Sequence, residues 1–197
     1  MSEMDLNETI NKLVRHKINP VRQKKRMSLG DAEQCRLIFE SAFLACDKTV
    51  KKFEMLPEYL EIVEWMANFD KGLLLTGSCG RGKTTILTGV IPIVFMHLSN
   101  KVVRPFIAVE MGKKMDEILR SVIICLDDVG TEQVVNDYGV KFEGFNRIVD
   151  NAETHQKLLF VSTNLTVEQI VSRYGERTLD RLTRLCKVVQ FSGDSLR

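Results

Sequence analysis

The chain has 197 residues, of which 44% are hydrophobic and 27% are charged, and its formal net charge is +2 at pH 7. This length is enough for one full hydrophobic core, and the small net charge argues against a protein that binds nucleic acid with its whole surface. The five scattered cysteines lack Cys-x-x-Cys spacing and the three histidines are isolated, which argues against a zinc site or a disulfide framework and favours reduced thiols in the cytoplasm.

The first 30 residues form a basic segment, with seven lysines and arginines against three acidic residues and a net charge of +4. We predict a short helix over about residues 6–15 and then a loop around Pro20. A solvated arm and an arm that binds phosphate groups or a protein partner both fit this charge. The stretch is too polar for a signal peptide, and the apolar run 86–98 is interrupted and too short to cross a membrane, so no membrane association is expected.

Two more helices are predicted before residue 70. Asp31 is a candidate N-cap with Gln34 three residues further on, and the apolar residues that follow support a helix to about residue 50. Pro57 is well suited to the first turn of another helix, whose apolar residues fit a hydrophobic core.

From Gly72 the pattern changes to alternating strands and helices. Strands are expected at 72–76, 103–109, 121–126, 158–162 and 188–191. Helices are expected near 83–96, 111–119, 140–154, 167–173 and 179–185. Near-continuous apolar strands such as 122–126 indicate burial on both faces, which is typical of a parallel sheet covered by helices. Pro92 is expected to kink the first of these helices or to end it early.

A phosphate-binding pattern, Gly77-x-x-x-x-Gly82-Lys83-Thr84, lies between the first of these strands and the helix after it. Glycines let the backbone turn tightly and direct N–H groups at phosphate oxygens, Lys83 can reach the β- and γ-phosphates, and the Thr84 hydroxyl can bind Mg²⁺. A helix that starts near Lys83 adds the positive end of its dipole. The predicted nucleotide-binding residues are Gly77, Ser78, Cys79, Gly80, Arg81, Gly82, Lys83, Thr84 and Thr85. Within them Cys79 is either an oxidation-sensitive position or a tolerated loop residue.

Two further strands are expected to end in polar side chains at the edge where open parallel sheets bind ligands. Asp127 and Asp128 follow the strand 122–126, and because adjacent strand residues point to opposite faces, Asp127 can hold Mg²⁺ while Asp128 turns toward an attacking water. The strand 158–162 leads into Asn164, which either orients a water at the γ-phosphate or caps the next helix.

Four arginines near the C-terminus recur at spacings of three and four residues, so they can line one helical face. They are Arg173, Arg177, Arg181 and Arg184. Such a face is either a solvated surface or the source of an arginine finger, which reaches the nucleotide of a neighbouring subunit and stabilises transition-state charge.

Taken in order, these motifs resemble those of the DnaC/IstB branch of the AAA+ ATPases, which contains helicase loaders and transposition ATPases. The resemblance rests on residues 72–85, on Leu126-Asp-Asp-Val-Gly-Thr-Glu132 and on Ser162-Thr-Asn-Leu165. It continues through Arg173-Tyr-Gly-Glu-Arg177, Leu179-Asp-Arg-Leu182 and the terminal Ser192-Gly-Asp-Ser-Leu-Arg197. It implies an α/β fold with a five-stranded parallel sheet covered by helices on both faces, preceded by a short helical extension. We assign residues 1–50 to that basic extension and residues 51–197 to the AAA+ ATPase domain.

The resemblance also implies roles for individual residues. Asp127 corresponds to the carboxylate associated with Mg²⁺, and Asp128 stands where most AAA+ proteins have a water-activating glutamate. Asn164 corresponds to the sensor of the γ-phosphate, Arg181 to the arginine finger that acts across a subunit interface, and Arg197 to the second sensor arginine. The segment 110–120 is shorter than the corresponding family segment, part of which is linked to single-stranded DNA, so direct DNA binding by the core is in question.

The function expected from this resemblance is Mg²⁺-dependent, assembly-stimulated ATP hydrolysis by a homo-oligomer with nucleotide at its subunit interfaces. The partner expected by analogy is a replicative DNA helicase, which the protein would load or remodel, with single- or double-stranded DNA as a further partner. The alternative is an IstB-like ATPase that regulates transposition through duplex DNA and a transposase. A small-molecule P-loop kinase is a third reading, but the sequence offers no candidate acceptor lid or base.

Overall fold

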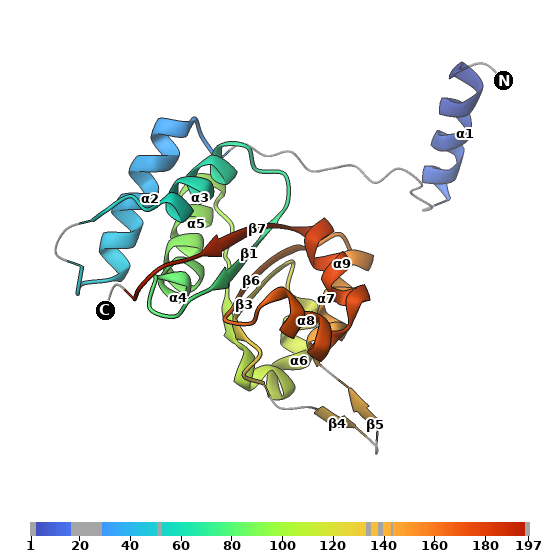
Figure 1. The fold of residues 1–197 in the computed structure, drawn as a ribbon. Helices are drawn as coiled ribbons and strands as arrows, with labels where there is room; N and C mark the ends of the chain where they lie inside the picture. The colour runs from blue at the N-terminus through green and yellow to red at the C-terminus, as the bar shows by residue number, and fades with distance from the viewer. Residues whose placement is uncertain are drawn as a thin grey trace.

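The structure, a computed structural model, describes residues 3–16, 29–50, 53–132, 135–137, 140–142 and 144–195. Its centre is a five-stranded parallel sheet in the order β2-β3-β6-β1-β7 (Figure 1). These strands are β1 (Gly72–Gly77), β2 (Pro105–Ile107), β3 (Ile123–Val129), β6 (Leu158–Thr163) and β7 (Cys186–Phe191). All five predicted strands are therefore present, and the predicted parallel sheet is confirmed.

Helices cover both faces of the sheet, as the apolar strands predicted (Figure 1). Alternate side chains of β1 enter two separate hydrophobic clusters, with Leu73 and Leu75 in one and Leu74 in the other. The first cluster joins the sheet to α2 (Ala32–Cys46), α3 (Pro57–Ala67) and α5 (Ile91–Ser99). The second joins it to α6 (Met111–Arg120), α7 (Gly144–Thr154), α8 (Val167–Tyr174) and α9 (Glu176–Leu185).

Local sequence signals fix the helices that precede the sheet. The Asp31 side chain accepts a hydrogen bond from the backbone N–H of Gln34 (2.8 Å), whose side chain accepts one from the backbone of Asp31, so the predicted capping box opens α2. Pro57 occupies the first turn of α3. The α2 side chains Phe39 and Phe43 are buried in the same cluster as α3 and β1. Helix α1 (Glu3–Arg15) comes before them, whereas most of the basic residues of the N-terminal segment lie outside the described residues.

The helix after β1 covers its predicted range, and of the two outcomes expected at Pro92 the early end is not observed. It runs as α4 (Lys83–Thr85), a π-helical turn η1 (Ile86–Val90) and α5, so it continues through Pro92 to Ser99 instead of ending early. Proline cannot donate a backbone hydrogen bond, and inside a continuous helix this loss interrupts the regular hydrogen-bond ladder. The wider π-helical turn comes directly before it.

Residues 140–154 also differ from the predicted single helix. Val140–Phe142 form strand β5, which pairs antiparallel with β4 (Val135–Asp137), and α7 begins only at Gly144. Between β2 and β3 the chain forms one 3-10 turn, η2 (Ala108–Glu110), followed by α6. The four C-terminal arginines do not share one helical face, because Gly175 separates Arg173 on α8 from the other three on α9.

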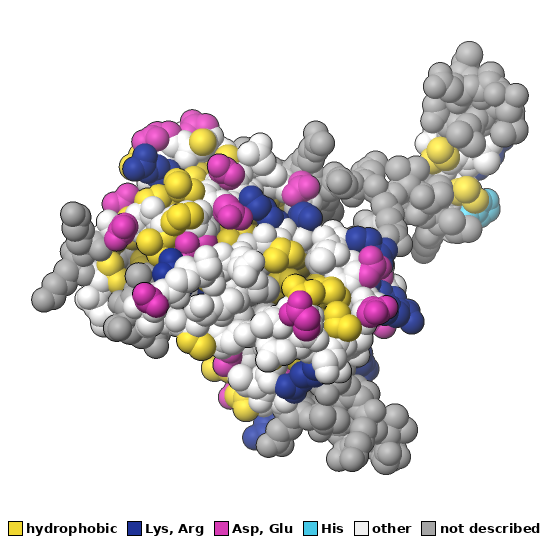
Figure 2. Space-filling model, in the orientation of Figure 1, with side chains coloured by type: hydrophobic (Ala, Val, Ile, Leu, Met, Phe, Trp, Pro, Cys, Tyr) yellow, Lys and Arg dark blue, Asp and Glu magenta, His cyan; other side chains and the backbone are white. Residues whose placement is uncertain are grey.

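The surface shown in Figure 2 mixes acidic and basic side chains, with hydrophobic atoms between them over the α2 and α3 region. Leu37 on α2 and Leu60 on α3 are both exposed, which is common for single surface residues. Among the described residues, no helix combines the length and the apolar character that crossing a membrane requires.

Candidate functional site

The loop between β1 and α4 is held in shape by its glycines and by β7. Gly77, Gly80 and Gly82 have φ angles of 106°, 75° and 87°. At Gly77 a Cβ atom would lie 2.1 Å from the carbonyl oxygen of Phe191, so no larger residue fits. The backbone N–H of Ser78 donates to the same carbonyl (3.0 Å). The end of β7 therefore supports the loop at its first turn.

Lys83 begins α4 with its side chain folded back over this loop. Its Nζ donates to the carbonyl oxygens of Gly77 (2.7 Å) and Ser78 (2.6 Å), and the residue is buried. Burial lowers the pKa of Lys83 because it penalises the charged form, while the negative charges of Asp128 and Asp127 act in the opposite direction. The ammonium group is thus held at the loop and within electrostatic range of both carboxylates.

The other predicted residues of the loop and of the first helical turn differ in accessibility. Ser78, Cys79 and Thr84 are exposed, Gly80, Gly82 and Thr85 are half-buried, and Arg81 is buried. Thr84 follows Lys83 at the start of α4, and its carbonyl accepts a hydrogen bond from the Thr88 hydroxyl (2.8 Å). The exposed hydroxyl of Thr84 suits a metal ligand that is completed by phosphate and water oxygens.

Asp127 and Asp128 lie at the carboxyl end of β3, where the strand is no longer regular. The register between β3 and β6 shifts between Leu126 and Val129, and Asp128 has a left-handed φ of 59°. Simple alternation of side chains therefore ends before Asp128. Backbone strain of this kind in a residue other than glycine costs about 1–3 kcal/mol and clusters at functional sites.

Ser162 on β6 connects the two carboxylate residues. Its hydroxyl donates to Oδ1 of Asp127 (2.5 Å) and accepts from the backbone N–H of Asp128 (2.9 Å). Asn164, two residues further on and exposed, donates from Nδ2 to Oδ1 of Asp128 (2.9 Å). Asp127, Asp128 and Asn164 are therefore brought together as expected. Ser162 was not predicted as a site residue, although the polar end of an apolar strand is a usable signal for it.

The sheet order places these groups next to the loop. Strand β6 lies between β1 and β3, with Leu75 of β1 opposite Ser162 and Leu126 of β3 opposite Val161. Because all three strands are parallel, their carboxyl ends meet at one edge of the sheet. Lys83, Asp127, Asp128 and Asn164 therefore come from three adjacent strand ends and form one site.

The structure places Arg181 away from this group of residues, on α9 against α7. Its guanidinium pairs with Asp150 and, through Nε, with Oε2 of Glu153 (2.7 Å). Glu153 also pairs with Arg184 (3.0 Å). Within one chain Arg181 is thus held by α7 carboxylates. The predicted sensor Arg197 lies outside the described residues.

A second buried network, which was not predicted from the sequence, lies just after Asp127 and Asp128 in the chain. Glu132 is buried, and its carboxylate accepts from the backbone N–H of Gly130 (2.8 Å) and from the Tyr174 hydroxyl. Arg173 donates to the backbone carbonyls of Gly130 and Glu132. These contacts tie the loop after Asp128 to α8. Glu132 ends the motif 126–132, but that pattern does not show that its carboxylate is buried.

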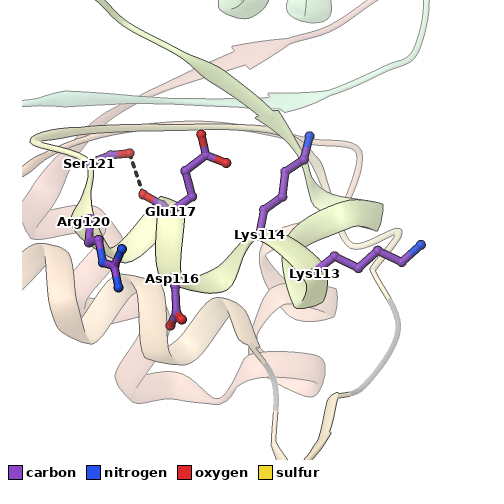
Figure 3. A pocket seen from close by; sticks show the side chains of 6 residues that line it. All are labelled: Lys113, Lys114, Asp116, Glu117, Arg120 and Ser121. Atoms are coloured by element: carbon purple, nitrogen blue, oxygen red, sulfur yellow. Dashed lines mark hydrogen bonds between the residues drawn. The ribbon is translucent and has the colours of Figure 1, made fainter.

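A shallow depression along α6 has a different character (Figure 3). Three basic residues, two acidic residues and a serine line it: Lys113, Lys114, Arg120, Asp116, Glu117 and Ser121. Glu117 pairs with Arg104, Lys114 pairs with Glu110 (2.5 Å), and the Ser121 hydroxyl donates to the Glu117 carbonyl (2.9 Å). Lys114 and Glu117 are thus already paired, and the depression contains none of the predicted site residues.

Comparison with known proteins gives no match to a protein-family model and none to a curated protein. Among solved structures, the DnaC helicase loader aligns with a TM-score of 0.56 and 18% identity over 76% of this chain and 98% of its own. DnaI aligns with a TM-score of 0.53 and 19% identity over 80% of this chain and 94% of its own. A proposed primosome component from Streptococcus pyogenes serotype M3 aligns with a TM-score of 0.50 and 17% identity, over 83% of this chain and 82% of its own.

At identities below 20%, these likenesses show a shared fold but do not show a shared activity. The chain therefore shares the fold of the DnaC helicase loader and DnaI, and the expected α/β fold with a five-stranded parallel sheet covered by helices is confirmed.

Proposed function

We propose that this protein binds ATP with Mg²⁺ and hydrolyses it, as a DnaC-type AAA+ ATPase that acts on a replicative DNA helicase. The observation that carries the proposal is the single site formed by the glycine-rich loop, Lys83, Asp127, Asp128 and Asn164 at adjacent strand ends. A small-molecule kinase would share the loop, but the Asp128–Asn164 contact suits the positioning of a water better than the binding of a small acceptor.

The residues present fit a nucleotide with its metal. The positive φ angles of the three loop glycines leave room for phosphate oxygens close to the backbone, and the start of α4 adds the positive end of a helix. Lys83 would exchange its two loop carbonyls for the β- and γ-phosphates. Thr84 and Asp127 would hold the metal, which would neutralise phosphate charge when bound. The other predicted contacts, from Ser78 to Thr85, are mainly backbone N–H groups.

Hydrolysis in this site depends mainly on the position of its side chains. Ser162 fixes the Asp127 carboxylate and the backbone of Asp128, so neither turns freely. Asn164 and Asp128 share a hydrogen bond, and together they would hold the attacking water, with Asp128 accepting its proton. The strained backbone of Asp128 is consistent with a residue that is held for this purpose.

The site of one chain is proposed to be incomplete without a second copy. Arg181 would enter the site of a neighbouring subunit as the arginine finger, and Arg197 would contact the nucleotide as the second sensor. Arg181 then has to exchange Asp150 and Glu153 for phosphate oxygens, or reach past them. This exchange makes hydrolysis dependent on assembly.

The partner and the domain division belong to the same proposal. The likeness to the DnaC helicase loader supports a replicative helicase as the partner. Residues 1–50 would serve as the extension that contacts it or DNA, residues 51–197 as the ATPase domain, and the protein would work in the cytoplasm.

The test uses the full chain. Lys83→Ala should abolish ATP binding, with turnover at background level, while unchanged turnover would refute the site. For the partner, co-purification of a hexameric helicase in the presence of ATP supports the proposal. ATP-dependent filaments on duplex DNA without helicase binding would favour the transposition alternative instead.

A further inference from the structure

A buried ion pair lies directly behind the phosphate loop, and the hydrolysis described above makes no use of it. Glu58, in the first turn of α3, and Arg81, in the loop, are 4% and 7% exposed. Oε1 of Glu58 accepts from Nε of Arg81 (2.6 Å) and lies 2.5 Å from a terminal guanidinium nitrogen. The next α3 residue, Tyr59, donates its hydroxyl to the backbone carbonyl of Arg81 (3.1 Å). Helix α3 therefore holds both the side chain and the backbone of the loop at Arg81.

The same guanidinium also holds the chain beyond β7. The second terminal nitrogen of Arg81 donates to the backbone carbonyl of Asp194 (3.0 Å). A Cβ atom at Gly193 would lie 2.9 Å from Arg81, and one at Gly80 would lie 2.2 Å from the Ser195 hydroxyl. Residues 193–195 are therefore packed against the phosphate loop. One side chain, Arg81, joins three segments that are far apart in the sequence.

Such a pair is a poor source of stability by itself, because removing two charges from water costs about as much as their attraction returns. Its geometry is better explained by position. With Glu58 and the Asp194 carbonyl as partners, the guanidinium is tied to α3 and to the chain after β7. A substitution that removes the charge of Glu58 leaves the Arg81 guanidinium buried without its counter-charge.

We propose that Glu58 is a positioning residue of the nucleotide site, which acts through Arg81 to fix the loop 78–82 and to seat residues 193–195 against it. The inference rests on the proposed nucleotide binding and extends it to a link with the chain end. Because such links are reciprocal, loosening the chain end weakens nucleotide binding, and bound nucleotide tightens the chain end.

The experiment compares Glu58→Gln with Glu64→Gln in the full chain. Glu64 lies on the same helix but is exposed, so the control makes the same chemical change where no buried partner is lost. Two quantities are measured: the rate at which carboxypeptidase releases Ser195 and Asp194 without nucleotide, and the Kd of a fluorescent ATP analogue. For Glu58→Gln we expect each to change by about tenfold, the release becoming faster and the binding weaker. Glu64→Gln should match the wild type.

A double variant guards against simple misfolding. Glu58→Gln with Arg81→Gln removes both charges, so no uncompensated buried charge remains, yet the link to Asp194 is still lost. It should fold with a wild-type circular dichroism spectrum and still release Asp194 rapidly. Wild-type release from Glu58→Gln, or rapid release without a change in Kd, would overturn the inference. If the wild type binds no nucleotide, the proposed function fails, and the release rates alone then decide the link between Glu58 and the chain end.

Discussion

Replacing Ser162 by alanine should separate the positioning of the carboxylates from nucleotide binding. The Ser162 hydroxyl is buried between β3 and β6, donating to Asp127 at 2.5 Å and accepting from the N–H of Asp128 at 2.9 Å. Ser162→Ala keeps the strand and its packing but removes both bonds. Neither of these two hydrogen bonds of Ser162 involves the phosphate loop.

The expected magnitude follows from the two groups left behind. A hydrogen bond to a charged group contributes about 1.5–3 kcal/mol, and a buried donor without a partner costs about 1–3 kcal/mol. Part of this cost is recovered by relaxation, because Asp128 is released from a left-handed conformation that costs about 1–3 kcal/mol. We therefore expect the free energy of unfolding to fall by about 2–4 kcal/mol.

The assay combines urea unfolding with ATP binding and turnover. Turnover should fall by more than tenfold while the Kd for ATP changes little, because Lys83 and the loop are untouched. Ser121→Ala is the matched control, since its hydroxyl bonds one backbone carbonyl at the opposite end of β3 (2.9 Å to Glu117). It should cost less than about 1 kcal/mol. Equal effects of the two variants on stability and turnover would refute the reasoning.

Three further predictions concern Arg181, Lys83 and Cys79. Arg181→Ala should keep ATP binding and lose hydrolysis, and mixing it with Asp128→Asn should restore turnover. Arg184→Ala is the control, because Arg184 also pairs with Glu153. Failure of Arg181→Ala and Asp128→Asn to complement each other would exclude action in trans. Burial lowers the pKa of Lys83 below its ordinary value of 10.5, so the Kd for ATP should begin to rise at a lower pH than an ordinary lysine would give. Between the lowered pKa and 10.5, the folded state should become more stable as the pH rises, since the unfolded chain then holds more protons. A Kd that stays constant up to pH 10.5 would contradict this. Exposed Cys79 should react with iodoacetamide, detected by mass spectrometry, and ATP should protect it while exposed Cys46 stays reactive; equal labelling of Cys79 with and without ATP would place the phosphates elsewhere.

Strong local patterns predicted most of the fold. Apolar runs ending in polar residues located the strands, and the Asp31–Gln34 capping box located the start of α2. The β4–β5 hairpin was missed because its two strands have only three residues each and pair with each other, not with the sheet. The expected arginine face was wrong because Gly175 interrupts the helical spacing on which it relied.

The candidate site was predictable where its chemistry lies in consecutive residues. The phosphate loop and the Asp127–Asp128 pair belong to this class. Glu58, Ser162 and Glu132 were not given roles, since their significance comes from partners 23, 35 and 42 residues away in the sequence. Burial and pairing of that kind are decided by tertiary packing, so local patterns alone did not identify these partners.

The π-helical turn after the phosphate loop sets the rotational phase of the helix that follows. The buried residues of this helix come in adjacent pairs spaced four apart: Ile86 with Leu87, Val90 with Ile91, and Val94 with Phe95. A regular α-helix has about 3.6 residues per turn, so eight residues would carry the third pair roughly 80° past the first. The wider turn at Ile86–Val90 takes up this excess rotation, and all three pairs face the sheet. Deleting one residue there would leave seven residues between the first and third pairs, a rotation of about 700° in a regular α-helix, so the pairs would stay within about 20° of one face and the π-helical turn would be replaced by a regular one.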